Sequence, residues 1–166
     1  MVLKLMLAAM VAVSARPRRP AEPAAAPVVA AAIDDLELEP APIRREWVLR
    51  GDPQARVSTH SAAGDRQATT AVWDCTAGTF RWHFDWDETV LIVEGAVHVT
   101  AADGSERTLS AGDIAYFPAG SWAKWHVEDY VRKVAFCRRQ FPAPVTMALK
   151  VGERMRRGLA RVGLAA

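Results

Sequence analysis

Short runs of β-forming residues, separated by Gly, Pro and Asp turns, restrict the fold of this chain more than any other feature. They fill the segment from about Thr69 to Cys137, and no helical pattern comes between them. The runs are residues 70–75, 80–84, 89–93, 96–101, 107–109, 114–117, 122–127 and 131–137. Gly78 and Gly95 are expected to end two of these runs, and Asp103-Gly104 predicts a hairpin between residues 96–101 and 107–109. Short strands at this spacing predict an all-β fold, a closed antiparallel sandwich or jelly roll.

Alternation within these runs predicts which side chains face the interior. Phe80, Trp82 and Phe84 fall on one face of their run, and His83 falls on the opposite face. In the run 122–127, the alternate residues Ala123, Trp125 and Val127 are all apolar and form a second row. Both rows are expected to line the inside of the barrel, with His83 facing outward.

Composition sets the domain limits. The chain has 166 residues, enough for one domain. All 13 aromatic residues lie between Trp47 and Phe141, whereas residues 1–42 contain none and hold six of the ten prolines. A segment that cannot contribute large apolar side chains to a core cannot offset its ordering entropy. We therefore expect residues 43–140 to be the folded domain and residues 1–42 to be a signal-like segment followed by a disordered Ala/Pro linker.

The first 15 residues resemble a secretory signal, because Lys4 precedes the apolar run 5–13 and a small-residue ending. The alternative is a dispensable extension, and on that view we expect a cytoplasmic protein; export is expected only if residues 1–15 act as a signal peptide. No apolar run reaches the ~18 residues of a membrane-spanning helix.

Charge and cysteine content exclude several classes of protein. The formal net charge of +2 is too small to indicate a nucleic-acid-binding protein. Two cysteines, Cys75 and Cys137, exclude a disulfide-dense domain and a multi-cysteine zinc module. They are expected to be buried free thiols.

The C-terminal segment, residues 141–166, carries a basic face beside an apolar face at helical spacing. It predicts a short basic amphipathic helix. Such a helix can contact an anionic membrane, but three glycines weaken it, and packing across its own domain is the favoured interpretation.

Two blocks centred on turns resemble the two motifs of the cupin superfamily, small β-barrels that bind metals and small molecules. Glu88 and Gly95 match the second half of the first motif, and Gly112, Pro118 and Gly120 match the second motif. Within this superfamily, residues 43–140 resemble the ureidoglycine aminohydrolase-type cupin domains. The resemblance implies a cupin-type antiparallel jelly-roll barrel, a ureide-like substrate class and a homodimer. The run 89–93, apolar on both faces, is consistent with dimerisation.

The metal ligands of the family pattern are missing from this chain. The two histidine positions before Glu88 hold Trp82 and Phe84, and the last ligand position holds Ala123. One carboxylate among aromatic rings does not hold a divalent ion, because such ions take three or four N, O or S donors. We therefore expect no metal and no other cofactor.

The sequence instead predicts an aromatic-walled pocket for a small polar molecule. Trp82, Phe84 and Trp125 are the expected walls, and Glu88 is the expected polar anchor and catalytic residue. If the protein is an enzyme, we expect acid–base chemistry of an aminohydrolase or isomerase kind, with Glu88 giving or taking a proton.

Two alternatives remain open at this point. A one-residue register shift would bring His83, Asp85, Glu88 and His126 together as the ligands of a metal-dependent aminohydrolase-type enzyme. Alternatively, the aromatic side chains simply fill the barrel of a non-catalytic structural or regulatory domain. In that case Glu88 would be a structural carboxylate, paired with a cation such as one from residues 132–133.

Overall fold

A computed structural model describes residues 27–141, 144, 145, 147, 151, 152 and 154. The chain divides into two compact units, Met1–Ala30 and Ala31–Ala166, and the fold below belongs to the second. Its elements are η1 (Ile33–Asp35), β1 (Glu39–Pro40), η2 (Arg45–Trp47), β2 (Val48–Gly51), β3 (Ala55–Ala62), β4 (Ala68–Phe84), β5 (Asp87–Ala101), β6 (Glu106–Ser110), β7 (Ile114–Phe117) and β8 (Ser121–Arg138).

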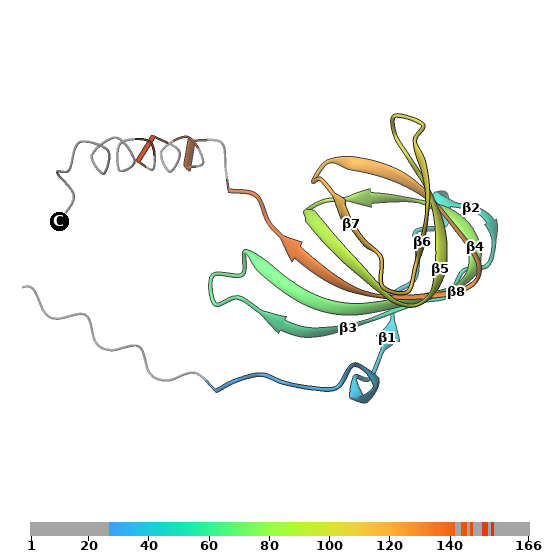
Figure 1. Cartoon of the computed structure of the whole chain (residues 1–166), viewed down its shortest axis with the longest axis horizontal. Helices are drawn as coiled ribbons and strands as arrows, with labels where there is room; N and C mark the ends of the chain where they lie inside the picture. The colour runs from blue at the N-terminus through green and yellow to red at the C-terminus, as the bar shows by residue number, and fades with distance from the viewer. Residues whose placement is uncertain (1–26, 142–143, 146, 148–150, 153, 155–166) are drawn as a thin grey trace, which may run out of the picture. The chain divides into compact units, whose positions relative to one another are not determined.

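The strands form one antiparallel sheet that curls into a barrel (Figure 1). Its order is β1-β3-β4-β8-β5-β6, with β2 added beside β4 and β7 added beside β5. The expected all-β jelly roll is confirmed. The long strands β4, β8 and β5 lie side by side in the middle of the order, so they position most of the interior side chains.

These three long strands replace six of the short runs expected from the sequence. Gly78 and Gly95 were expected to end runs, but each lies at an irregularity inside a continuous strand. A β-bulge lets a strand bend without ending. Gly95 has φ +69°, and a Cβ there would lie 2.0 Å from the carbonyl oxygen of Tyr130. Only glycine therefore fits where β5 bends against β8.

The part of the expected disordered linker that covers residues 33–42 is ordered. Pro40 pairs with Arg56 of β3, and the Ala41 N–H donates to the Ala55 carbonyl at 2.8 Å. Asp34 accepts a hydrogen bond from the Arg132 guanidinium of β8 at 2.7 Å. Backbone pairing and an ion pair hold this segment, and neither requires aromatic side chains, which the segment lacks.

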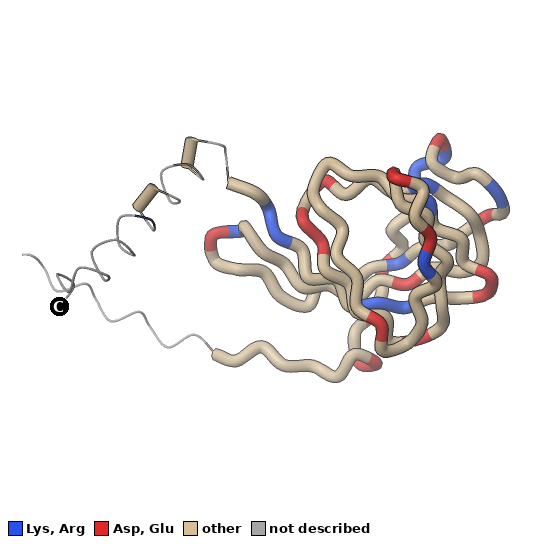
Figure 2. Tube along the Cα trace, turned by 45° about the horizontal axis from the view of Figure 1, so that its top comes forward, with Lys and Arg blue, Asp and Glu red and all other residues tan. Residues whose placement is uncertain are grey.

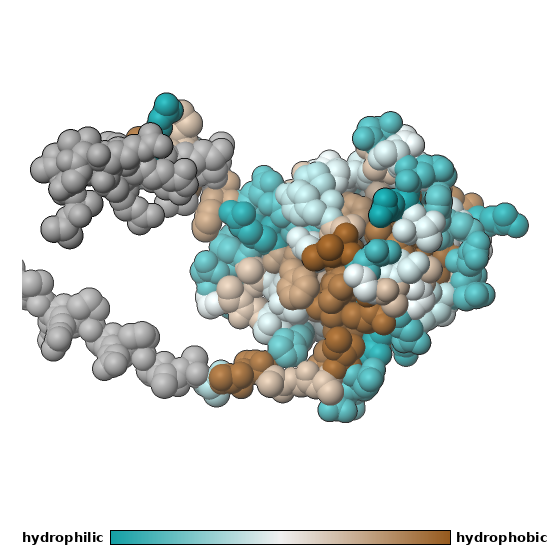
Figure 3. Space-filling model, in the orientation of Figure 1, coloured by the Kyte–Doolittle hydropathy of each residue, from teal (hydrophilic) through white to brown (hydrophobic). Residues whose placement is uncertain are grey.

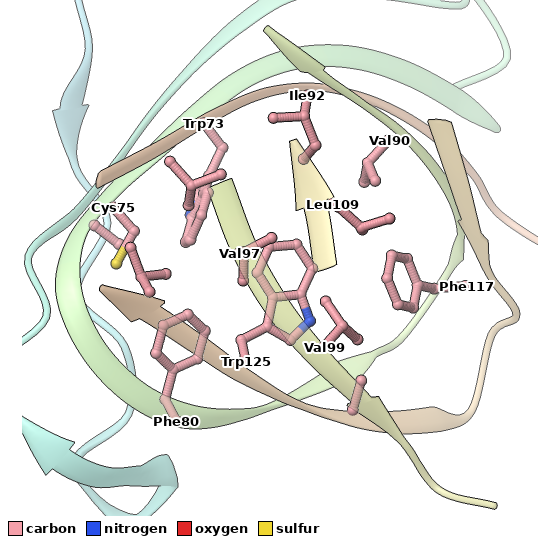
Figure 4. Packing of buried hydrophobic residues seen from close by; sticks show 14 of the residues in the cluster. Trp73, Cys75, Phe80, Val90, Ile92, Val97, Val99, Leu109, Phe117 and Trp125 are labelled. Atoms are coloured by element: carbon pink, nitrogen blue, oxygen red, sulfur yellow. The ribbon is translucent and has the colours of Figure 1, made fainter. Parts of the chain in front are cut away.

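Apolar side chains from all sides fill the barrel, as the view in Figure 4 shows. Phe80, Phe84 and Trp125 are each 1% exposed, and Trp82 packs against the core while half-buried. The Phe84 ring stacks on Phe117, with centroids 4.3 Å apart and planes 4° apart. The predicted inward alternation is thus confirmed.

Both chain ends fall largely outside the described residues. This holds for the signal-like segment 1–15 and the linker up to residue 26. Of the predicted tail helix, residues 144, 145, 147, 151, 152 and 154 are described and are helical, and the rest lies outside. In the described part of the chain, no helix is both long and apolar enough to cross a membrane.

Candidate functional site

A charged pair lies inside the otherwise apolar barrel. Most charged residues of the described chain are exposed or half-buried, and basic and acidic positions are interspersed along it (Figure 2). Lys133 of β8 instead faces the interior, in register with Trp73 of β4 and Ile92 of β5. Its Nζ donates a hydrogen bond to Oε1 of Glu88. The side chains of Lys133 and Glu88 are only 5% and 13% exposed, so the ion pair is largely removed from water.

Two indole rings surround the ammonium group. The Nζ atom of Lys133 lies 5.0 Å from the ring centroids of both Trp73 and Trp125. These rings are 6.0 Å apart and nearly perpendicular, at 80°. Aromatic faces attract a cation, and more strongly when water is excluded. The interior therefore holds one carboxylate and one ammonium against aromatic walls.

Glu88 is held in place by its neighbour Asp87 at the start of β5. The Asp87 carboxylate accepts hydrogen bonds from the Ala119 backbone N–H, Tyr116 Oη and Gln140 Nε2, each at 3.0 Å. These bonds lower the pKa of Asp87, and the bond from the Ala119 N–H has the largest effect. They tie the start of β5 to the turn between β7 and β8, which fixes the backbone that carries Glu88.

The thiols are free and are not activated. Cys137 is in register with Glu88, and burial together with this carboxylate raises the pKa of its thiol. Burial, and then Asp74, raises the pKa of Cys75 to about 12. Because the thiolate is the nucleophilic form, neither cysteine is suited to nucleophilic catalysis. Both thiols are free as expected, but only Cys75 is buried, whereas Cys137 is half-buried.

The expected pocket walls are in the interior, but they are tightly packed. Phe84 and Trp125 belong to the buried core, and Trp82 lies against Trp47 and Trp73 with centroids 5.8 and 5.9 Å away. Hollows lie elsewhere: one of about 700 Å³ is lined by residues 42, 43, 45 and 48–54, and one of about 210 Å³ lies beside β5, β6 and β8. Glu88 is paired with a cation, so it is not the isolated carboxylate among aromatic rings that the motif positions alone suggest.

The four alternative metal ligands do not come together. His83 faces outward, where its Nδ1 lies 2.7 Å from Asp85 and its ring lies against Trp122. His126 is bonded to Thr79 at 2.8 Å, whereas Glu88 is in the interior with Lys133. Within the described residues, no group of three His, Cys, Asp or Glu side chains is arranged to hold a metal ion.

The other buried charge, Asp74, has a structural environment. Its carboxylate accepts from Arg56 at 3.1 and 2.5 Å and from Tyr130 Oη at 2.9 Å. Burial, followed by this bond to Asp74, raises the pKa of Tyr130 to about 12. Two hydrogen bonds from a guanidinium and one from a hydroxyl offset the cost of burying this carboxylate. No local sequence pattern indicated this cluster, because its members come from β3, β4 and β8.

Comparison with known proteins agrees with this architecture. Residues 62–135 match the family model of the EutQ-like cupin domain. A DUF861-family protein of unknown function from Pseudomonas syringae is 25% identical, with a TM-score of 0.56, over 61% of this chain and 44% of that one. A putative ethanolamine utilization protein EutQ from Salmonella typhimurium is 21% identical over 51% of this chain and 69% of that one, with a TM-score of 0.46. A DUF861-family protein from Thermotoga maritima is 38% identical over 39% of this chain and 73% of that one, with a TM-score of 0.37.

No curated protein matches the chain. The curled antiparallel sheet and the family match nevertheless agree with the motif positions. Gly95, Gly112 and Gly120 all adopt positive φ, at 69°, 94° and 80°, which explains why the motif requires glycine at these turns and bends. The chain therefore has a cupin-type barrel, in which residues 62–135 match the EutQ-like cupin domain.

Proposed function

We propose that the protein binds a small polar molecule at the Glu88–Lys133 pair inside the barrel, without a metal ion. The pair itself carries this proposal. Removing a carboxylate and an ammonium from water costs several kcal/mol per ion, and an apolar pair of similar volume is often more stable. A buried ion pair that is kept despite this cost is therefore a candidate for function.

The pair offers complementary chemistry to a ligand. Glu88 accepts hydrogen bonds or a proton, and Lys133 donates them. Glu88 is the more exposed partner, at 13%, so a ligand would approach from the end of the barrel where β5 begins. If turnover occurs, Glu88 is the candidate base or acid, and Lys133 is the candidate stabiliser of a developing negative charge.

The aromatic residues would form the walls of this site. Trp125 and Phe84 come from the core, and Trp82 would complete the wall beside Trp73. The indole N–H groups of Trp73 and Trp125 are buried and have no hydrogen-bond partner among the described residues. A buried unsatisfied donor costs about 1–3 kcal/mol, so an acceptor group on a ligand would regain part of that free energy.

A thermal-shift screen, followed by calorimetry, tests the proposal. The resemblance to ureidoglycine aminohydrolase-type cupins makes ureides the first probes, followed by amidines and sugar phosphates. We expect a reproducible rise in Tm with at least one compound. The double variant E88Q/K133M should lose this response, and D85N, which changes an exposed carboxylate, should keep it.

Two outcomes would contradict this function. No Tm response across the panel would favour a packed, non-catalytic domain, in agreement with the burial of Phe84 and Trp125. A response that requires added metal and is lost in H83N would favour the metal-dependent alternative.

We also propose that the protein forms a homodimer through the outer face of β5, β7 and β8. Tyr116 and Phe136 both pair with Thr89 of β5, and they are 59% and 47% exposed. Ile114, which pairs with Leu91, is 68% exposed. Figure 3 shows apolar residues gathered over this region. Contiguous exposed apolar residues on a sheet favour association.

Light scattering at tens of micromolar checks the oligomeric state. We expect the mass of a dimer for the native chain and of a monomer for I114E/F136E. The variant T108E, which adds a charge on β6, is the control and should remain dimeric. A native protein that is monomeric at this concentration would contradict the proposal.

A further inference from the structure

Two histidines meet on the outer face of the sheet, away from the interior pair. His98 of β5 and His126 of β8 are direct cross-strand partners. Thr108 of β6 pairs with His98 on one side, and Thr79 of β4 pairs with His126 on the other. Four strands thus place a Thr-His-His-Thr row across the sheet. Directly opposed side chains in adjacent strands lie about 4.5–5.5 Å apart at Cβ.

The threonines orient both imidazole rings. Nδ1 of His126 is 2.8 Å from Thr79 Oγ1, and Nδ1 of His98 is 3.1 Å from Thr108 Oγ1. When the hydroxyl oxygen accepts from Nδ1–H, the lone pair of each ring lies on Nε2. Metal-ligating histidines almost always have such a partner on the other ring nitrogen.

A hollow of about 210 Å³ lies beside this row. Its lining includes both histidines, Thr108 and Glu128. The carboxylate of Glu106 on β6 lies 3.5 Å from Nε2 of His98. The surroundings therefore combine two oriented imidazoles with negative charge.

We propose that His98 and His126 form a two-imidazole binding site for a transition-metal ion such as Zn²⁺ or Cu²⁺. Imidazole nitrogen is a preferred donor for these ions. Since the described residues contain no preformed group of three donors, water molecules complete the coordination, with the carboxylates of Glu106 and Glu128 balancing the charge. This site is independent of the proposed ligand site in the barrel.

Titration of the untagged full-length chain with Zn²⁺, followed by calorimetry, tests the site. We expect one ion per chain. Removing a ligand in H98N or H126N should abolish stoichiometric binding, whereas T79V should weaken it about 10- to 100-fold, because Thr79 only orients its histidine. H60N is the matched control, since His60 lies on β3, with its Nδ1 3.2 Å from Ser61 Oγ, and it should bind as the native chain does.

Electron paramagnetic resonance with Cu²⁺ gives a second readout. The expected spectrum shows splitting from two imidazole nitrogens, which falls to one in H98N and in H126N. Absence of saturable Zn²⁺ binding would overturn the proposal, as would binding that survives both histidine substitutions. Binding lost in H83N but kept in H98N would overturn it too, and would place the ion elsewhere.

Discussion

Replacing Lys133 with methionine is expected to lower the free energy of unfolding by about 3–5 kcal/mol, because the substitution leaves the Glu88 carboxylate buried without its cation. The double variant E88Q/K133M should regain most of this loss, since neither charge is then present in the interior. Urea unfolding of the native chain, both single variants and the double variant provides the measurement as a double-mutant cycle.

The exposed pair of His83 and Asp85 supplies the control for this cycle. Asp85 is 78% exposed, so D85N should change stability by less than about 1 kcal/mol. If K133M costs no more than D85N, or if the effects of E88Q and K133M simply add, Lys133 and Glu88 do not interact as the structure describes.

Replacing Gly95 with alanine is expected to cost at least about 3 kcal/mol. A positive φ alone costs an L-residue about 1–2 kcal/mol, and the new Cβ would lie 2.0 Å from the Tyr130 carbonyl oxygen, so β5 or β8 must also shift. Urea unfolding midpoints measure the loss.

A substitution at Gly104 separates the cost of a positive φ from the cost of the steric clash at Gly95. Gly104 has φ +84°, but nothing lies within 4 Å of the position that a Cβ would occupy there. G104A should therefore show only the conformational cost of about 1–2 kcal/mol. Equal losses for G95A and G104A would mean that the close approach of β5 to β8 is absent.

Much of the fold could be predicted from local patterns. The alternation at Phe80, Trp82 and Phe84 correctly identified the interior face, and Asp103-Gly104 correctly marked the hairpin between β5 and β6. Strand ends at Gly78 and Gly95 were wrong, because a glycine that permits a bulge looks the same in sequence as one that ends a strand. The segment Ala55–Ala62 was missed as β3 because few of its residues are apolar.

The site was less predictable, because the sequence does not show which face of β8 turns inward or how β5 and β8 are aligned. In β8, Lys133 alternates with Val131 and Ala135 on one face, but Val134 and Phe136 make the other face equally apolar. The sequence could therefore name Lys133 only as one possible partner of Glu88. The His98–His126 pair depends on the register between β5 and β8, which is set by the bulge at Gly95 and not by local sequence.

A crystal structure of the full-length protein, grown with excess zinc, would show the interior pair and all the histidines at once. We expect it to show Lys133 Nζ bonded to Glu88 inside the barrel, His83 outside beside Asp85, and any bound zinc at His98 and His126. A zinc ion inside the barrel, liganded by Glu88 together with His83, would contradict the metal-free interior.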